Sequence, residues 1–334
     1  MEMRIHHGVV VLGIALALLA PRKDPSTHAV AVALAQAQTQ LPPAQSPQAQ
    51  PQPQTPATQP PANVSGPVED NSVRLAIIGD TGTGTQSQFD VGAELTRARQ
   101  RFPFEFVIML GDNIYGSERP QDFAEKFEKP YATLLTQKVL FYAALGNHDD
   151  PTQRYYKPFN MNGERFYTFT KGDARFFALD SNYMDQTQLK WLESQLSSSN
   201  SRWKVAFFHH PLYSSGGRHG SATDLRTLVE PLFVKYGMDV VFAGHEHFYE
   251  RIKPQNGIYY FIEGGSAKLA KGDIRRTGLT AVGVDTDFTF MLAELGKTNM
   301  QFQVLSRAGK RVDGGILPLV PDPPRSADAS SRTQ

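Results

Sequence analysis

The stretch FVIMLGDNIYGS, residues 106–117, places an apolar run of strand length directly before an acid, an amide and a phenol. Phe106 to Leu110 carry no polar side chain, which is typical of a strand that is buried on both faces. Gly, Asp and Asn favour turns, so a turn with Tyr115 as a core aromatic explains the second half by itself. Whether Asp112 and Tyr115 also belong to a functional site depends on which side chains other segments of the chain place beside them.

Similar apolar runs recur along the chain. In the early part of the chain these runs alternate with segments of helical spacing, and later they follow one another without helices between them. This order predicts an α/β layered domain. In such a domain the chemistry is expected on the loops at the strand ends. We expect strands at Val73–Ile78, Phe106–Leu110, Val139–Ala144, Arg165–Thr170, Arg175–Leu179, Lys204–Phe208, Val240–Ala243, Tyr259–Ile262, Phe288–Leu295 and Met300–Leu305. We expect helices at Phe89–Arg101, Asp122–Leu135, Thr187–Leu196 and Asp224–Tyr236.

Metal-ligating residue types follow five of these predicted strands. Each has a structural explanation of its own, because an Asp can cap a helix and a lone buried His is usually a hydrogen-bonded core residue. Together they indicate a pair of hard cations, which need a shared carboxylate and several O and N donors. The five segments are Gly79-Asp80-Thr81-Gly82, Gly111-Asp112-Asn113-Ile114-Tyr115, Gly146-Asn147-His148-Asp149, Phe208-His209-His210-Pro211 and Gly244-His245-Glu246-His247.

The composition narrows the class of protein. The hydrophobic fraction of 40% is enough for a sizeable core in 334 residues. Lys plus Arg number 34 against 33 for Asp plus Glu, so no excess of charge indicates a nucleic-acid or anionic-membrane partner. The chain has no cysteine, which excludes disulfides, thiolate metal sites and a cysteine nucleophile. Any metal must therefore be held by O and N atoms.

The two ends of the chain differ from the middle. An apolar run from Val9 to Ala20, too short to span a bilayer, predicts a signal peptide over residues 1–35, with an uncleaved membrane anchor as the alternative. A Pro- and Gln-rich segment, residues 36–70, predicts a disordered spacer, and residues 318–334 predict a disordered tail. We therefore expect one folded domain over residues 71–317 in a secreted, periplasmic or extracellular protein.

The five motifs carry a resemblance to a known family. GDTG, GDNIY, GNHD, a His that ends an apolar strand and GHEH resemble, in order, the motifs of the purple acid phosphatases, within the calcineurin-like metallophosphoesterases. The resemblance runs from about Val73 to about Leu317. The fourth motif departs slightly, because Ala206 stands where the family usually has Val. The resemblance implies a short single-domain form: a layered αββα sandwich of two mixed sheets, with a dinuclear metal site on loops at the strand ends.

The resemblance also implies a role for each motif residue. In this family the Tyr is a phenolate on Fe(III) and gives the purple colour, so the implied cofactor is Fe(III) with a second Fe, Zn or Mn ion. His148 and His219 are the implied proton donors. From its position next to His148, Asp149 is expected to orient that imidazole, and His210 either supports the site from behind a ligand or has no role. The implied ligands are Asp80, Tyr115 and His247 on the first metal, Asn147, His209 and His245 on the second, and Asp112 as the bridge.

The function implied by the resemblance is that of a secreted acid phosphatase that acts on small-molecule phosphate monoesters, with a metal-bound hydroxide as nucleophile and a His as general acid. Two alternatives stay open. A phosphodiesterase or nucleotide hydrolase would use the same dinuclear site, and a secreted metal-binding protein would use the scaffold without catalysis. We expect no stable membrane association after signal cleavage, and the motifs leave the physiological substrate and the oligomeric state open.

Overall fold

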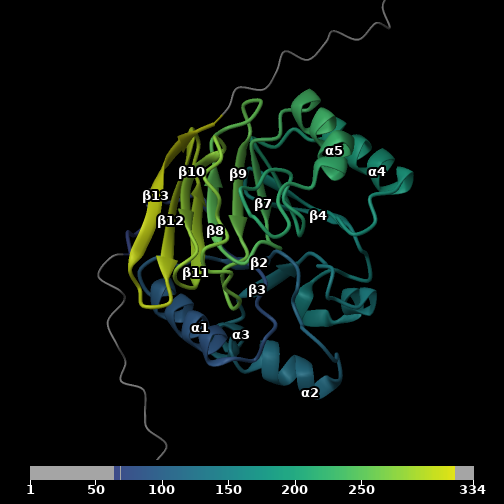
Figure 1. Cartoon of the computed structure of the whole chain (residues 1–334). Coiled ribbons are helices and arrows are strands. Elements are labelled where there is room, and N and C mark those ends of the chain that lie inside the picture. Colours follow the sequence, from purple (N-terminus) through teal and green to yellow (C-terminus); the bar gives the residue numbers. More distant parts are fainter. Residues whose placement is uncertain (1–63, 68, 320–334) are drawn as a thin grey trace, which may run out of the picture. The chain divides into compact units, whose positions relative to one another are not determined.

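The computed structural model describes residues 64–67 and 69–319. The predicted signal peptide, the spacer up to residue 63 and the tail from residue 320 lie outside the described residues. Two sheets stack face to face, with helices on their outer sides (Figure 1). Among the residues that the structure describes, no helix has the length and apolar character needed to cross a membrane.

The first sheet has six strands. Its centre is parallel, because β1 pairs with β2 and β2 with β3 in the same direction, and the strands from the end of the chain join antiparallel beside β1. Its spatial order is β13 (Arg311–Pro318), β12 (Asn299–Ser306), β11 (Thr289–Leu295), β1 (Val73–Ile78), β2 (Phe106–Met109) and β3 (Leu140–Ala143).

The second sheet has seven strands and is also mixed. Four of them, β5, β6, β7 and β9, run parallel, and the flanking strands pair antiparallel. Its spatial order is β10 (Thr280–Val284), β8 (Tyr249–Ile252), β9 (Tyr259–Glu263), β7 (Val240–Ala243), β6 (Trp203–Phe208), β5 (Ala174–Ala178) and β4 (Tyr167–Lys171).

Alternate residues of the central strands belong to different parts of the core. In β2, Phe106 and Ile108 face the other sheet, and Val107 and Met109 pack under the helices. Both faces of β2 are therefore buried, and this explains why the strand reads as a continuous apolar run. The fold is the predicted αββα sandwich of two mixed sheets.

Helices cover the two outer faces. One side holds α1 (Gln86–Arg99) and α3 (Ala132–Thr136), and the other holds α4 (Gln186–Ser197) and α5 (Thr223–Lys235). The single helix predicted over Asp122–Leu135 is wrong. Pro130 cannot donate a backbone bond and ends a regular helix, and the segment forms α2 (Pro120–Phe123), a π-helical turn η1 (Ala124–Glu128) and α3. Two 3₁₀ turns, η2 (Pro151–Tyr155) and η3 (Lys157–Phe159), follow β3.

Ten strands lie where the sequence predicts them, and three were missed. The missed strands β8, β10 and β13 carry charged residues or glycines within them, and β10 and β13 lie at sheet edges where many side chains are half-exposed. Such strands lack the continuous apolar run that marks the central ones.

Contacts of the domain begin before residue 71. Val64 is buried in the core under α1. The backbone N–H of Ser65 donates to Oε1 of Gln303 at 2.9 Å, and Nε2 of Gln303 donates back to the Ser65 carbonyl at 2.9 Å. Residues 64 and 65 therefore pack against the sheet, although the predicted spacer extends to residue 70.

Candidate metal centre

The five motif segments all begin where a parallel strand ends. The segments after β1, β2 and β3 leave one edge of the first sheet, and those after β6 and β7 leave the second sheet. Carboxyl ends of neighbouring parallel strands meet at the same edge, so the chain brings distant residues together there. The seven predicted metal ligands form one cluster, described below as two groups joined by Asp112.

The first group contains Asp80, Asp112 and His247, whose candidate ligand atoms all lie within 4.8 Å of one another. Oδ1 of Asp80 is 3.4 Å from Nε2 of His247 and accepts a hydrogen bond of 3.0 Å from the phenol of Tyr115. The phenol oxygen also lies 3.4 Å from Nε2 of His247. Tyr115 therefore points its hydroxyl into this group rather than into the core.

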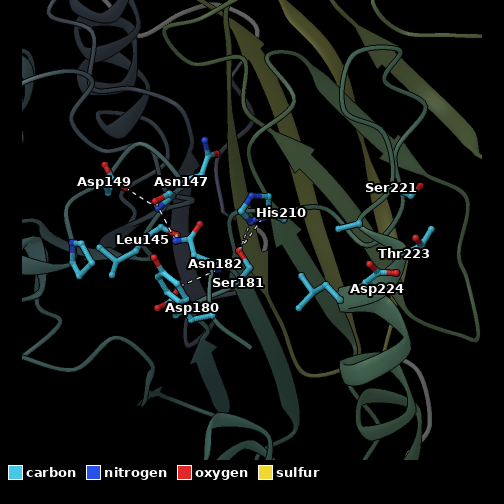
Figure 2. A pocket seen from close by; sticks show the side chains of 15 residues that line it. Leu145, Asn147, Asp149, Asp180, Ser181, Asn182, His210, Ser221, Thr223 and Asp224 are labelled. Carbon is cyan, nitrogen blue, oxygen red and sulfur yellow. Dashed lines mark hydrogen bonds between the residues drawn. The ribbon is translucent and has the colours of Figure 1, made fainter. Parts of the chain in front are cut away.

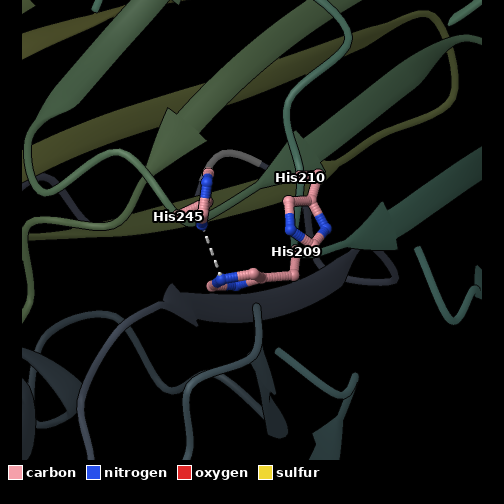
Figure 3. Close-up of side chains that lie close together, drawn as sticks. All are labelled: His209, His210 and His245. Carbon is pink, nitrogen blue, oxygen red and sulfur yellow. Dashed lines mark hydrogen bonds between the residues drawn. The ribbon is translucent and has the colours of Figure 1, made fainter. Parts of the chain in front are cut away.

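The second group forms around His209. Its Nδ1 lies 2.9 Å from the Leu110 carbonyl, which can only accept, so in the neutral form of the ring that binds metals Nδ1 carries the proton and Nε2 presents a lone pair. That Nε2 atom is 3.0 Å from Oδ1 of Asn147. It also lies 3.1 Å from Nδ1 of His245 (Figure 3). A third histidine, His210, has a ring nitrogen within 4.8 Å of His209 and His245.

Asp112 connects the two groups. It belongs to the first group, and its Oδ1 atom also lies 3.4 Å from Nε2 of His209 in the second group. The backbone N–H of His148 donates to the same oxygen at 3.0 Å, which fixes the carboxylate in place. A carboxylate in this position can reach a cation in either group.

The backbone around the cluster is unusual. Asp80, Asp112 and His245 have φ values of 55°, 52° and 70°, in the left-handed region that few non-Gly residues adopt, although Asp and His enter it more often than most. Such strain concentrates at functional sites. Gly146 shows how tightly the loops pack, because a Cβ atom there would overlap the Asp112 carboxylate. Likewise, a Cβ atom on Gly244 would lie 2.7 Å from Oδ2 of Asp80.

Burial controls the protonation of the cluster. It raises the pKa of Asp80 to about 7 and lowers the pKa of His245 to about 2 and of His247 to about 4. Burial also raises the pKa of Asp112, but the His209 imidazole and a bond from Tyr115 outweigh it, so this pKa lies below its ordinary value. The His245 and His247 imidazoles are thus neutral, which is the form that binds metals.

The donor set fits a pair of cations. The lone pair of His209 Nε2 meets the side-chain oxygens of Asn147 and Asp112, and of its three neighbours only His245 can donate a proton to it. Acceptors that face each other with few donors between them repel one another unless a cation lies between them. Carboxylate, amide and imidazole donors suit Fe, Zn and Mn, and Tyr115 adds a phenol oxygen.

Both predicted proton donors flank the cluster. The ring of His148 is exposed and lies 5.0 Å from the Tyr115 ring, and the ring of His219 lies 4.2 Å from the His245 ring. The predicted role of Asp149 in orienting His148 is wrong. The Asp149 carboxylate is buried and accepts from the backbone of Gly146 at 2.8 Å and of Ile114 at 3.1 Å, so it shapes the loops.

Three residues at the cluster were missed or left without a role by the sequence analysis. Glu246, between the two histidines of the fifth motif, is buried and accepts hydrogen bonds from the loop that carries His219. The ammonium of Lys268 lies 3.7 Å from the centre of the Tyr115 ring. His210 joins the second group. His210, next to a motif histidine, and Glu246, inside the fifth motif, had a signal in the sequence, whereas Lys268 had none.

Two stacked mixed sheets with a two-group donor cluster at the strand ends define the class of metallophosphoesterases, whose fold implies a dinuclear metal centre. The profile of the calcineurin-like phosphoesterase family matches residues 73–249. The chain belongs to the calcineurin-like phosphoesterase family.

Within that family the chain is similar to purple acid phosphatases. It is 27% identical over 244 residues to purple acid phosphatase 17 of Arabidopsis thaliana, covering 61% of this chain and 71% of that protein. It is 25% identical over 237 residues to human tartrate-resistant acid phosphatase type 5, covering 58% of this chain and 72% of that one. These relatives make the chain a metallophosphoesterase related to the purple acid phosphatases.

Solved structures agree on the fold. Purple acid phosphatase PPD1 from yellow lupin seeds aligns with a TM-score of 0.63 at 19% identity, over 75% of this chain and 54% of that chain. GAP50, described as the anchor in the inner membrane complex of Plasmodium, aligns with a TM-score of 0.63 at 20% identity. The alignment covers 74% of this chain and 89% of that chain. One fold thus serves a phosphatase and an anchor, so any argument about activity must rest on the side chains.

Proposed function

We propose that the protein is a secreted, metal-dependent acid phosphatase that hydrolyses phosphate monoesters at a dinuclear centre. The observation that carries the proposal is the position of the Asp112 carboxylate, which lies within the Asp80 and His247 group and 3.4 Å from His209 of the other group. The names of the relatives, purple and tartrate-resistant acid phosphatases, support the monoester reaction.

Two bound cations would neutralise the charge of the phosphate group. They would also lower the pKa of water enough for hydroxide to be available as the nucleophile that attacks phosphorus. In this proposal the chain holds them with the residues of the two groups. Lys268 adds a positive charge beside the Tyr115 ring, where it favours a phenolate over a phenol. The proposed ligands are Asp80, Tyr115 and His247 for one cation, Asn147, His209 and His245 for the other, and Asp112 for both.

The leaving alcohol needs a proton, and two histidines are placed to give it. His219 has its Nδ1 atom 3.7 Å from a carboxylate oxygen of Glu246, which leaves Nε2 as the atom that can meet the leaving oxygen. His148 is exposed, and its ring lies 5.0 Å from the ring of Tyr115. Low pH keeps such donors charged, and this favours activity below neutral pH.

A comparison of two esters tests the reaction class. The metal-loaded protein is assayed on 4-nitrophenyl phosphate and on bis(4-nitrophenyl) phosphate between pH 4 and pH 9, together with elemental analysis. We expect about two metal ions per chain, faster hydrolysis of the monoester and an optimum below pH 7. A faster diester reaction would favour the phosphodiesterase alternative, and no hydrolysis by a fully loaded protein would favour the non-catalytic one.

Export is tested separately. The apolar run from Val9 to Ala20 supports a cleaved signal, and it lies outside the described residues. N-terminal sequencing of the mature protein from a secreting host should show a start after the apolar run. A full-length protein in the membrane fraction would show an uncleaved anchor instead.

A further inference from the structure

A cavity of about 620 Å³ adjoins the second group of the metal centre. Asn147 and His210 belong both to its lining and to the surroundings of His209. Its lining comes from the loop after β3, the loop after β5 and the start of α5, so that Asn147 and Asp149 lie opposite Thr223 and Asp224 (Figure 2). The cavity thus begins beside the atoms that would hold the phosphate.

One wall of the cavity is a fixed pair of polar side chains. Oγ of Ser181 accepts the backbone N–H of His210 at 3.1 Å and lies 2.8 Å from Nδ1 of the same residue. Because Oγ already accepts one bond, its own proton is available for Nδ1. The His210 ring, 4.5 Å from the His245 ring, is therefore held at the boundary between the metal centre and the cavity.

The charge of the lining is one-sided. It contains three carboxyl groups, several hydroxyls and amides, apolar side chains such as Leu145, Pro151 and Leu225, and no Lys or Arg among the residues that line it. Asp149 is occupied by the backbone donors described above, and Asp180 by Arg165 at 2.7 Å and by the N–H of Asn182 at 3.0 Å. Asp224 is exposed in the first turn of α5, so its carboxylate is available to a ligand.

We propose that this cavity binds the alcohol part of the phosphate ester and selects uncharged, hydroxyl-rich alcohols. The inference rests on the proposed function. Sugar or polyol hydroxyls can donate to Asp224 and exchange bonds with Ser181. An apolar ring would cover these polar groups without replacing their bonds with water, and a second phosphate would be repelled by Asp224.

Three phosphate esters test the selection: glucose 6-phosphate and cyclohexylmethyl phosphate, which are esters of primary alcohols, and glucose 1,6-bisphosphate, which adds a second phosphate on the anomeric carbon. The measured quantity is the ratio of kcat/KM between two esters, compared between wild type and variant so that intrinsic reactivity cancels. In Ser181→Ala and Asp224→Ala the preference for glucose 6-phosphate over cyclohexylmethyl phosphate should fall about tenfold. In Asp224→Lys the preference for glucose 1,6-bisphosphate over glucose 6-phosphate should rise about tenfold, because the repulsion of the second phosphate is replaced by attraction.

Glu105→Lys is the matched control, because Glu105 is exposed just before β2, at the end of that strand away from the metal centre. It changes the net charge as Asp224→Lys does and should leave all ratios unchanged. Ratios that stay constant in Ser181→Ala, Asp224→Ala and Asp224→Lys would overturn the cavity proposal while the phosphatase reaction stands.

A binding measurement separates the two proposals if no ester is hydrolysed. Methyl glucoside binding is then followed by saturation-transfer NMR on the wild type and on Asp224→Lys. Weaker binding to Asp224→Lys than to the wild type would support the cavity proposal even though the proposed function had failed. Equal binding, or none to the wild type, would overturn the cavity as well.

Discussion

The Oε2 atom of Glu246 lies 3.7 Å from the Nδ1 atom of His219. The same carboxylate accepts the N–H of Gly220 at 2.6 Å and the hydroxyl of Ser214 at 3.2 Å. The loop also packs against it directly, because a Cβ atom on Gly216 would overlap the carboxylate. One buried side chain therefore ties the His219 loop to the motif that carries two proposed ligands.

Glu246→Gln keeps the size of the side chain and an oxygen for Gly220, but replaces the carboxyl oxygen that faces His219 with an NH2 group that cannot accept from the ring. We expect kcat on an alkyl phosphate to fall about 10- to 100-fold with little change in KM. A nitrophenyl ester, which departs without a proton, should lose much less. His219→Ala should show the same pattern, with an alkyl-ester loss on the order of 10²–10⁴-fold.

Glu105→Gln is the control for Glu246→Gln, since it makes the same change at an exposed position. The ¹⁵N shifts of the His219 ring report its tautomer and should change only in Glu246→Gln. Equal losses on both esters with unchanged shifts would mean that Glu246 acts only through stability.

Asp112→Ala tests the bridge. Because this carboxylate reaches both groups, its removal takes a donor from two cations at once. We expect no measurable activity and less bound metal than in Asn147→Ala, which removes a donor from one group. Elemental analysis of the two variants, purified side by side, makes the comparison. Metal content in Asp112→Ala equal to that of wild type would exclude a bridging role.

Gly146→Ala tests the close packing of the loops. The added Cβ must displace the Asp112 carboxylate, at a cost of about 1–3 kcal/mol in the free energy of unfolding. We expect lower metal affinity as well. Gly278→Ala is a matched control, because a Cβ atom there meets nothing within 4 Å. Urea unfolding and metal titration of both variants should change only for Gly146→Ala.

The sequence predicted the central strands well, because strands buried on both faces need continuous apolar runs. Phe106–Leu110 and Val240–Ala243 are of this kind. The edge strand β13 has half-exposed residues and two glycines, so no such run marks it. The helix expected over Asp122–Leu135 failed because its apolar spacing continues across Pro130, where the backbone cannot.

The residues of the candidate site also fall into those that the sequence predicted and those that it did not. Asp80, Asp112 and His245 were predicted because each lies within two residues of a Gly that follows a recognisable strand. Glu246 and Lys268 were not, because their roles depend on loops whose paths no local pattern reveals. The sequence therefore indicated the proposed ligands, and the structure was needed for the residues that position their surroundings.

The start of the domain yields another prediction. A chain that begins at Val64 should be as stable as the full chain, whereas a chain that begins at Asn71 loses the burial of Val64 and the bonds between Ser65 and Gln303. We expect the shorter chain to lose about 1.5–3 kcal/mol in the free energy of unfolding. Urea unfolding of the two chains measures the difference, and equal midpoints would show that residues 64–70 add no stability.

Tyr115 separates the metal-site interpretation from the core interpretation most sharply. Burial and the carboxylates of Asp80 and Asp112 raise its pKa well above the ordinary value, so without a cation the phenol keeps its proton and donates it to Asp80. A trivalent cation would displace that proton, and Lys268 over the ring favours the resulting charge. Binding of Fe(III) should therefore convert the phenol to a phenolate ligand.

We expect the iron-loaded, oxidised wild type to show a broad visible absorption that disappears or shifts far in Tyr115→Phe. If Tyr115 were only a core aromatic, the change would cost about 1 kcal/mol of stability and leave the spectrum unchanged. Tyr260→Phe is the matched control, because the hydroxyl of Tyr260 also donates to a carboxylate, that of Glu230 at 2.9 Å, away from the metal centre. It should lose similar stability and keep the absorption band. A colourless iron-loaded wild type, or the same band in Tyr115→Phe, would show that the phenol does not bind the metal.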